Sequence, residues 1–319
     1  MTMGTTEESE AFLTEVCWHY YVNELTQSEV ARAMGVTRLR VNRALQEARA
    51  AGIVRVEITS PFLARIEMQE ELRQKLNLDE VICAPANPEA HDYHMPAGAA
   101  LAAWLEPGLR EGRWRSIGVS WGMTLKNAFL RLPRMTLPGV EIVSMIGGTS
   151  QGGSFNSFGI ASGFADKLGA SYSLFSAPIY LSPGTDKAGF LSEGVFKTHL
   201  RKLEKLDLAV LVVGDVTDKS FLVSMGLPSG ITADDLRAAG AVGDVLGHFL
   251  TVDGVEVDHP INRCAIGLDL DSLSQVPQCV LAAAGAHKVE AIIASCRRGV
   301  VDTLITDDVT GHLILDKLG

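Results

Sequence analysis

Three polar side chains on one predicted helix have the chemistry needed to read base pairs. Arg43 can bond to guanine O6 and N7, and Asn42 or Gln46 can bond to adenine N6 and N7, each through two hydrogen bonds. From Arg32 to Arg55 the chain carries six arginines and a single acid, Glu47. A local basic patch with these side chains predicts contact with DNA.

Two helices joined by a tight turn must position these side chains. Thr26 suits the cap of a first helix, Gly35 allows the turn, and Thr37 suits the cap of a second helix. The apolar residues expected on the inner faces recur at helical spacing: Val30, Ala33 and Met34, then Val41, Ala44, Leu45 and Ala48. A further helix is expected at residues 11–22 and a short strand at residues 53–58.

This arrangement is typical of a helix-turn-helix, whose second helix enters the major groove. An ordinary helical hairpin with solvated arginines is the alternative, but cap, turn, stripe and charge agree with the first interpretation. The expected DNA contacts are Gln27, Ser28, Thr37, Arg38, Leu39, Arg40, Asn42, Arg43, Gln46 and Arg49.

The composition limits where DNA can be bound. The chain has 319 residues, 47% of them hydrophobic, and a formal net charge of −10, so only a local patch can attract a polyanion. Five cysteines without CxxC spacing suit a reducing compartment. No segment has the pattern of a signal peptide or a membrane span. We therefore expect a cytoplasmic protein without a zinc site, a cofactor or a membrane segment.

Beyond Asp79, short apolar strands alternate with helical segments. The expected strands are VICA, RSIGVS, VEIVSMIGG, ASYSLF, DLAVLVVG, HFLTV, CAIGL, CVLAAA and VDTLIT. Such alternation predicts an α/β fold with a doubly wound, mostly parallel sheet. The expected domains are a DNA-binding domain at residues 1–60, a linker helix at 61–78 that pairs between subunits, and an effector and oligomerisation domain at 79–319.

Three loops that follow predicted strands carry groups suited to an anion. In such sheets ligands lie beyond the carboxyl ends of the strands, so these loops share one edge. The third loop opens a helix with Lys288 in its first turn, where a cation opposes the helix dipole unless an anion binds. Each loop alone also fits a plain turn, but together they favour a phosphorylated ligand. Their donors are Ser120 and Thr124, then Thr149, Ser150 and Asn156, then Lys288.

Other patterns carry less chemistry. GVSWG matches the G-x-S-x-G pattern of a hydrolase nucleophile at Ser120, but only one strand precedes it in this domain. His91 and His94 are spaced to meet on a helix face, yet without a third metal ligand we expect them at the surface. The acid pairs Asp234/Asp235, Asp269/Asp271 and Asp307/Asp308 are expected as helix caps, with Thr232 and Thr306 beside them.

These stretches together resemble the SorC family of bacterial transcriptional regulators, which join a helix-turn-helix to a sugar-binding domain related to phosphosugar isomerases. The resemblance rests on residues 25–56, SIGVSWGMTL from Ser116, the glycines at 147 and 148, GAVGDVLGHFLTVDG from Gly240, and GAHKVEAIIASCRRGVVDTLITD from Gly285. The opening stretch is similar to regulators of sugar-alcohol catabolism such as that of erythritol. One departure is Ala286 and His287, where many members have a second glycine.

The resemblance implies a pocket for a phosphorylated sugar or polyol whose binding alters affinity for double-stranded operator DNA. It also implies a homodimer or homotetramer. Thr149 of the second loop is expected beside the residues that the resemblance implies at the pocket, which are Ser120, Gly122, Thr124, Gly147, Gly148, Asp244 and Lys288.

Two other functions fit parts of the pattern. An isomerase-like phosphosugar enzyme with an appended DNA-binding domain needs a base near the sugar, and Asp215 and Asp244 are candidates. An architectural DNA-binding protein needs no ligand, which the large second domain argues against. We expect a transcriptional regulator that is not an enzyme.

Overall fold

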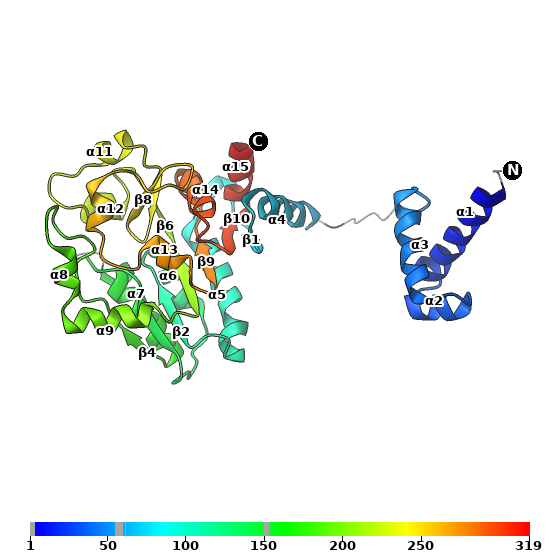
Figure 1. Cartoon of the computed structure of the whole chain (residues 1–319), viewed down its shortest axis with the longest axis horizontal. Coiled ribbons are helices and arrows are strands. Elements are labelled where there is room, and N and C mark those ends of the chain that lie inside the picture. Colours follow the sequence, from blue (N-terminus) through cyan, green and yellow to red (C-terminus); the bar gives the residue numbers. More distant parts are fainter. Residues whose placement is uncertain (1–3, 55–59, 61, 150–152) are drawn as a thin grey trace. The chain divides into compact units, whose positions relative to one another are not determined.

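The computed structural model describes residues 4–54, 60, 62–149 and 153–319, with side chains from residue 9 onward (Figure 1). The chain forms two compact units, Met1–Leu63 and Ala64–Gly319, called here the small unit and the large unit. Of the strand predicted at residues 53–58, residues 55–58 lie outside the described part of the chain.

The small unit is a bundle of short helices around one apolar core. Its elements are α1 Gly4–Cys17, the π-helical turn η1 Trp18–Val22, α2 Gln27–Ala33 and α3 Arg38–Ala50. The stripe predicted on the second helix is confirmed, because all four of its residues are buried. The core consists of Leu13, Val16, Cys17, Val30, Ala31, Val41, Ala44, Leu45 and Ala48.

The inner face of α2 differs from the prediction at one position. Ala33 is exposed, whereas Ala31 is buried. The inward positions are Gln27, Val30, Ala31 and Met34, which recur at i, i+3, i+4 and i+7. Packing against α3 therefore turns the helix so that Ala33 falls outside the buried face.

The predicted caps and turn are confirmed. The Glu29 N–H donates to Thr26 Oγ1 at 3.4 Å while the Thr26 N–H donates to Glu29 Oε2 at 2.8 Å, which is a capping box. The Arg40 N–H donates to Thr37 Oγ1 at 3.2 Å, which caps α3. Gly35 has a φ of 64°, a conformation that favours glycine.

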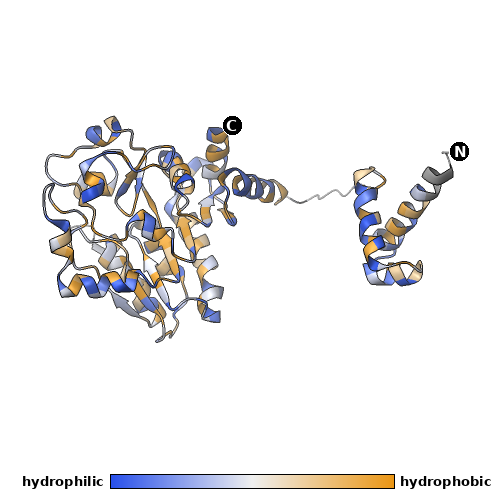
Figure 2. Cartoon of the chain, in the orientation of Figure 1, coloured by the Kyte–Doolittle hydropathy of each residue, from blue (hydrophilic) through white to orange (hydrophobic). Residues whose placement is uncertain are grey.

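A seven-stranded parallel sheet organises the large unit. Its order is β1-β10-β9-β5-β2-β3-β4. Figure 2 shows hydrophobic residues concentrated in the strands at the centre of this unit. The strands are β1 Glu80–Ala84, β2 Ser116–Val119, β3 Glu141–Ser144, β4 Ser171–Ser173, β5 Leu208–Leu211, β9 Cys279–Ala282 and β10 Thr303–Asp307.

Helices cover both faces of this sheet. From β1 to β4 the strands are added in one direction, and from β4 to β10 in the other, so right-handed crossovers place the two sets of helices on opposite faces. Accordingly α5, α6 and α7 pack in succession, and α14 packs with α15. These helices are α5 His94–Glu111, α6 Met123–Arg131, α7 Ser157–Leu168, α14 Val289–Arg298 and α15 Asp308–Leu318.

Shorter elements complete the large unit. A small antiparallel sheet has the order β6-β7-β8. Its strands are β6 Val213–Asp215, β7 Gly243–Val245 and β8 His248–Leu250. The remaining helices are α4 Leu63–Leu76, α8 Lys187–Leu191, α9 Gly194–Leu203, α10 Phe221–Met225, α11 Ala233–Ala238, α12 Pro260–Cys264 and α13 Leu270–Leu273, with the 3-10 turns η2 Pro88–Ala90, η3 Gly153–Phe155 and η4 Ala286–Lys288.

One strand prediction differs from the structure, and the predicted linker helix is present as α4. The segment CAIGL forms no strand; Ala265 and Gly267 make isolated bridges to Tyr180 and Ile146, because the chain only crosses its neighbours there. The helix predicted as a linker is α4, and its buried residues Met68, Leu72 and Leu76 belong to the core of the large unit. That helix therefore packs on the large unit through these residues, and its pairing between subunits stays a prediction.

We predict that Thr26→Ala destabilises the small unit by about 0.5–2 kcal/mol, because the Glu29 N–H loses its capping acceptor and the hydrogen bond from the Thr26 hydroxyl to Glu29 Oε2 is lost. Amide hydrogen exchange of residues 27–50 in the full chain measures this change. Thr14→Ala is the matched control, since the Thr14 hydroxyl donates only to the Glu10 carbonyl within α1. Equal exchange rates in both variants would contradict the importance of the cap.

Candidate functional site

The outer face of α3 carries the side chains predicted to read bases. Arg43 and Gln46 are exposed, and Asn42 is half-buried. None of these three forms an ion pair or a side-chain hydrogen bond with any residue that the structure describes. Leu39 is 60% exposed on the same helix. The face is therefore available to a partner.

Some of the other predicted DNA contacts have a role within the small unit. The Arg40 guanidinium lies 4.7 Å from the centre of the Phe12 ring, and Arg49 Nε donates to the Leu45 carbonyl at 3.3 Å. Thr37 caps its own helix. The other three predicted contacts are Gln27 and Ser28 of α2 and Arg38 of α3. They line one hollow together.

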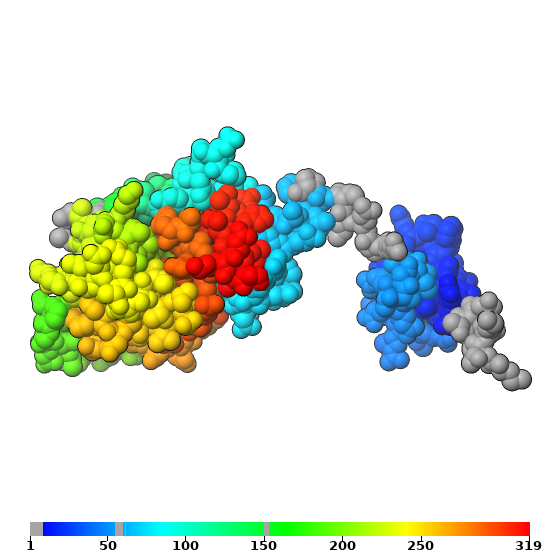
Figure 3. Space-filling model, turned by 90° about the horizontal axis from the view of Figure 1, so that it is seen from above, coloured from blue at the N-terminus to red at the C-terminus, as the bar shows by residue number. Residues whose placement is uncertain are grey.

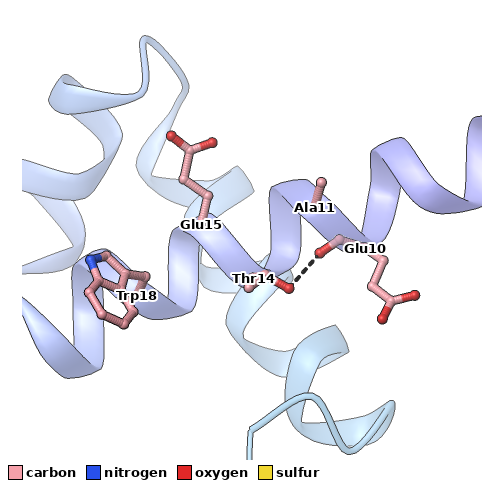
Figure 4. Close-up of a pocket in the computed structure, with 5 residues that line it drawn as sticks. All are labelled: Glu10, Ala11, Thr14, Glu15 and Trp18. Atoms are coloured by element: carbon pink, nitrogen blue, oxygen red, sulfur yellow. Dashed lines mark hydrogen bonds between the residues drawn. The ribbon is translucent and has the colours of Figure 1, made fainter.

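A second hollow of the small unit lies along α1 (Figure 4). Glu10, Ala11, Glu15 and Trp18 line it together with Thr14, whose hydroxyl already donates to the Glu10 carbonyl at 2.8 Å. Both charged residues in this lining are acids, so the hollow does not suit an anion.

The large unit has a cavity of about 290 Å³ at the carboxyl edge of its parallel sheet. It lies where the order of strands reverses, between β2, which leads to β3, and β5, whose chain returns towards β9. Such a reversal opens a crevice between neighbouring strand ends. Gly122 and Met123 line the cavity after β2, Asp215 lines it after β5, and His287 and Lys288 line it after β9.

Two lysines line this cavity, and Lys288 is half-buried whereas Lys219 is exposed. Lys288 forms no ion pair and no side-chain hydrogen bond with a described residue. Burial lowers the pKa of Lys288, and the nearby carboxylates of Asp215 and Asp244 oppose that effect. Lys288 occupies the N-cap of α14, rather than the first turn that the sequence predicted. An anion in the cavity would offset the cost of a cation there.

Two buried carboxylates line the cavity with Lys288. Asp244 accepts from the Gly247 N–H at 3.0 Å, and burial raises the pKa of Asp244 to about 6 despite that hydrogen bond. Asp215 accepts from the Thr217 N–H at 2.7 Å and lies 3.8 Å from His287 Nε2. Carboxylates accept hydrogen bonds, so this part of the lining suits hydroxyl donors.

A group of rings that the sequence did not indicate borders Lys288. The Tyr93 ring lies 4.5 Å from that of His94 and 4.8 Å from that of His287, and all three residues line the cavity. Burial, helped by the charge of Lys288, lowers the pKa of His94 to about 4. The surface position expected for His94 is therefore wrong. His91 is also half-buried, and its Nε2 lies 2.6 Å from the Asp307 carboxylate.

Three aromatic side chains in the lining contact one another. The Phe221 ring centre lies 5.2 Å from that of Trp121 and 4.9 Å from that of Phe155, in edge-to-face contacts. Trp121 belongs to the loop after β2, whereas Phe221 begins α10. The cavity therefore has apolar as well as charged groups in its lining.

Of the predicted loop after β3, Phe155 lines this cavity, whereas Gly147, Gly148 and Thr149 do not. Gly147 and Gly148 donate to the Ile266 and Ala177 carbonyls, and a Cβ on Gly147 would lie 2.4 Å from the Pro178 carbonyl oxygen. The crossing chain thus accounts for Gly147, and a Cβ on Gly148 would meet Phe158. Thr149 lines a separate hollow with Gly148, and Ser150 lies outside the described residues.

Ser120 and Thr124 lie beside the cavity rather than in its lining. Thr124 is buried, with Oγ1 3.2 Å from His94 Nδ1. Ser120 is 1% exposed, and its hydroxyl has no hydrogen-bond partner among the described residues. A hydrolase needs a base within reach of its nucleophile, and the described histidines do not bond to Ser120.

The paired acids act mainly at helix starts. Asp235 and Thr232 form a capping box, and Asp269 caps α13. Asp307, rather than Thr306, caps α15. Within the described residues, no helix has the length and apolarity to cross a membrane, and no group of three or more His, Cys, Asp or Glu side chains is placed to hold a metal ion.

Comparison with known proteins identifies relatives of the whole chain. Residues 60–316 match the Sugar-bind family model, a sugar-binding domain. The chain is 31% identical over 317 residues to the transcriptional regulator LsrR of Escherichia coli O139:H28 (strain E24377A / ETEC), which covers 98% of this chain and 96% of that protein.

Solved structures have the same fold. The full-length sorbitol operon regulator SorC from Klebsiella pneumoniae has a TM-score of 0.69 at 24% identity, covering 97% of this chain and 99% of that one. A DeoR family transcriptional regulator from Listeria monocytogenes has a TM-score of 0.66 at 25% identity, covering 79% and 99%. All three named proteins are regulators of transcription rather than enzymes. The chain belongs to the SorC family of transcriptional regulators, which contain a sugar-binding domain.

Proposed function

We propose that a phosphorylated sugar or polyol binds in the cavity between β2 and β5 and changes the affinity of this regulator for operator DNA. The observation that carries the proposal is Lys288, a cation without an ion pair among the described residues, in the lining of a cavity at the carboxyl edge. A phosphate beside Lys288 forms a charge-assisted contact that a neutral sugar lacks.

The surroundings of Lys288 support a phosphate at this position. Gly122 and Met123 belong to the N-terminal end of α6, and Lys288 begins α14, so both helices present the positive ends of their dipoles. The Gly122 N–H is already used, because it donates to the Phe155 carbonyl at 2.8 Å. The Val289 N–H at the start of α14 is also used, because it donates to the Ala286 carbonyl. A phosphate would therefore accept from later N–H groups of these first turns.

The rest of the lining favours a small polyhydroxylated ligand. Asp215 and Asp244 accept hydrogen bonds from hydroxyl groups, while Trp121 and Phe221 offer apolar surface to a carbon chain or ring face. The volume of about 290 Å³ is near the lower end of the range for small-molecule sites. Phosphorylated four- to six-carbon sugars and sugar alcohols, erythritol phosphate among them, fit this description.

The small unit supplies the DNA-binding part of the function. Arg43, Gln46 and Asn42 are placed for base contacts, and the arginines beside them suit phosphate contacts. One such reader buries little surface, so tight binding favours two readers on two half-sites of an inverted repeat. We propose a homodimer or homotetramer acting on chromosomal DNA in the cytoplasm.

Arg43→Ala should weaken binding to a preferred sequence by about 1–3 kcal/mol and relax the choice of base, because a contact to base edges is lost. Arg49→Ala should weaken all sequences alike and reduce the salt slope by about one. Titrations of a fragment selected from random DNA, at several salt concentrations, measure both effects. Unchanged affinity of Arg43→Ala would show that the assigned face is wrong.

Lys288→Ala should weaken binding of the phosphate ester about 10- to 100-fold and leave the unphosphorylated sugar nearly unaffected, since a charged hydrogen bond contributes about 1.5–3 kcal/mol. A thermal-shift panel of phosphorylated sugars and polyols finds the ester, and calorimetry measures its affinity. Lys197→Ala, an exposed lysine on α9, is the control. If the ester binds Lys288→Ala as tightly as the parent, the site is wrong; steady conversion of the ester would contradict a non-enzymatic role.

Sedimentation analysis with and without operator DNA should give a dimer or tetramer, and footprints should cover two half-sites about one helical turn, or a multiple of it, apart. A monomer under both conditions would exclude paired readers.

A further inference from the structure

Two adjacent carboxylates at the junction of β10 and α15 connect the cavity to helix α4. Asp307 Oδ1 accepts from the Thr310 N–H at 2.6 Å, and its Oδ2 lies 2.6 Å from His91 Nε2. Asp308 Oδ1 accepts from the Ala86 N–H at 2.9 Å, and its Oδ2 lies 3.2 Å from Arg65 Nη2. One carboxylate therefore faces the cavity segments, and its neighbour holds α4.

On the cavity side, both segments around Lys288 are tied to this junction. The Thr310 hydroxyl accepts from the Gly285 N–H at 2.8 Å, and Gly285 immediately precedes the turn that ends at Lys288. His91 contacts Tyr93 edge to face, with ring centres 6.0 Å apart. Tyr93 lines the cavity. A ligand that moves either segment thus acts on Asp307 or Thr310.

On the other side, α4 lies directly against α15. A Cβ on Gly311 would come 2.9 Å from Met68 Sδ and 3.4 Å from Leu72 Cδ1, so the absence of a side chain there permits close packing. Figure 3 shows the surface of α15, in red, beside that of α4, in blue to cyan. The boundary between the two units follows Leu63. Among the described residues of α4, Arg65 forms the side-chain hydrogen bond that lies nearest to this boundary.

The junction has the physical properties of a transmitting element. Asp307 and Thr310 are fully buried, so their hydrogen bonds are costly to break without replacement. The side chains of Arg65 and Asp308 are 30% and 25% exposed, so water screens their ion pair less than one on the open surface. Since the two acids are consecutive residues at one helix start, a displacement of the Asp307 backbone also shifts Asp308.

We propose that Asp307 and Asp308 transmit occupancy of the cavity to α4, and through α4 to the DNA-binding unit. Their role is one of positioning, because neither residue is part of the cavity lining. The regulatory role of this connection rests on the proposed function. The coupling between Asp307 and α4 can be tested without an effector.

The first test uses the ligand-free full chain. His91→Ala removes the contact with Asp307, because alanine has no hydrogen-bonding side chain, and we expect amide exchange in residues 63–69 of α4 to accelerate severalfold. The same substitution in an Asp308→Asn background should add nothing, because a neutral amide at position 308 no longer forms the ion pair that reaches Arg65. His312→Ala, at an exposed histidine on α15, is the control and should leave α4 unchanged. Equal exchange of α4 in the parent and in His91→Ala would overturn the proposal.

The second test adds ribose 5-phosphate as the probe. Protection of residues 285–298 in both the parent and Asp308→Asn, with a response of α4 in the parent alone, supports the connection. An equal response of α4 in both proteins overturns it. A probe that protects residues 285–298 in neither protein counts against the proposed phosphate site, and the His91→Ala comparison then decides on the connection. Arg73→Gln controls for ion pairs in general, because Arg73 pairs with Glu70 inside α4.

Discussion

The reversal of strand order between β2 and β5 is the constraint on which the rest of the large unit depends. Because all seven strands are parallel, their carboxyl ends meet at one edge, and the loops diverge only where the order reverses. The residues of the cavity come from far apart in the chain. Most of them follow the parallel strands β1, β2, β3, β5 and β9, whereas Asp244 lies in β7 of the antiparallel sheet. The cavity is therefore a consequence of topology, and its chemistry depends on which residues follow each strand.

The balance of charge inside the cavity explains how selectivity can arise. Lys288 alone would attract many anions, whereas the carboxylates of Asp215 and Asp244 repel them. A ligand offsets that repulsion only if it also donates hydrogen bonds to these carboxylates. A phosphate ester of a sugar offers both an anion and hydroxyl donors. The aromatic side chains Trp121, Phe155 and Phe221 favour ligands with apolar surface, since only such surface is stabilised by contact with these rings.

Features with a local cause could be predicted from the sequence. The caps Thr26 and Thr37 act on residues three positions away, and alternating strands and helices indicate the parallel sheet. The buried face of α2 depends instead on packing against α3. The need for Gly147 after β3 depends on the chain that crosses at Pro178. His94 was missed because only the folded chain brings its ring beside Tyr93 and Lys288, and no spacing pattern records that contact.

Connectivity then limits how the cavity can influence DNA binding within one chain. Helix α4 is the first element of the large unit after the boundary at Leu63, so an effect carried along the chain must pass through it. Met68, Leu72 and Leu76 anchor α4 through apolar contacts, which are non-directional and tolerate small shifts of a helix along its neighbour. The pair of Arg65 and Asp308 is directional, since a guanidinium and a carboxylate must meet within about 3 Å to hydrogen-bond well. A displacement too small to disturb the apolar packing therefore changes this pair first, which makes it the contact best suited to report the state of the cavity.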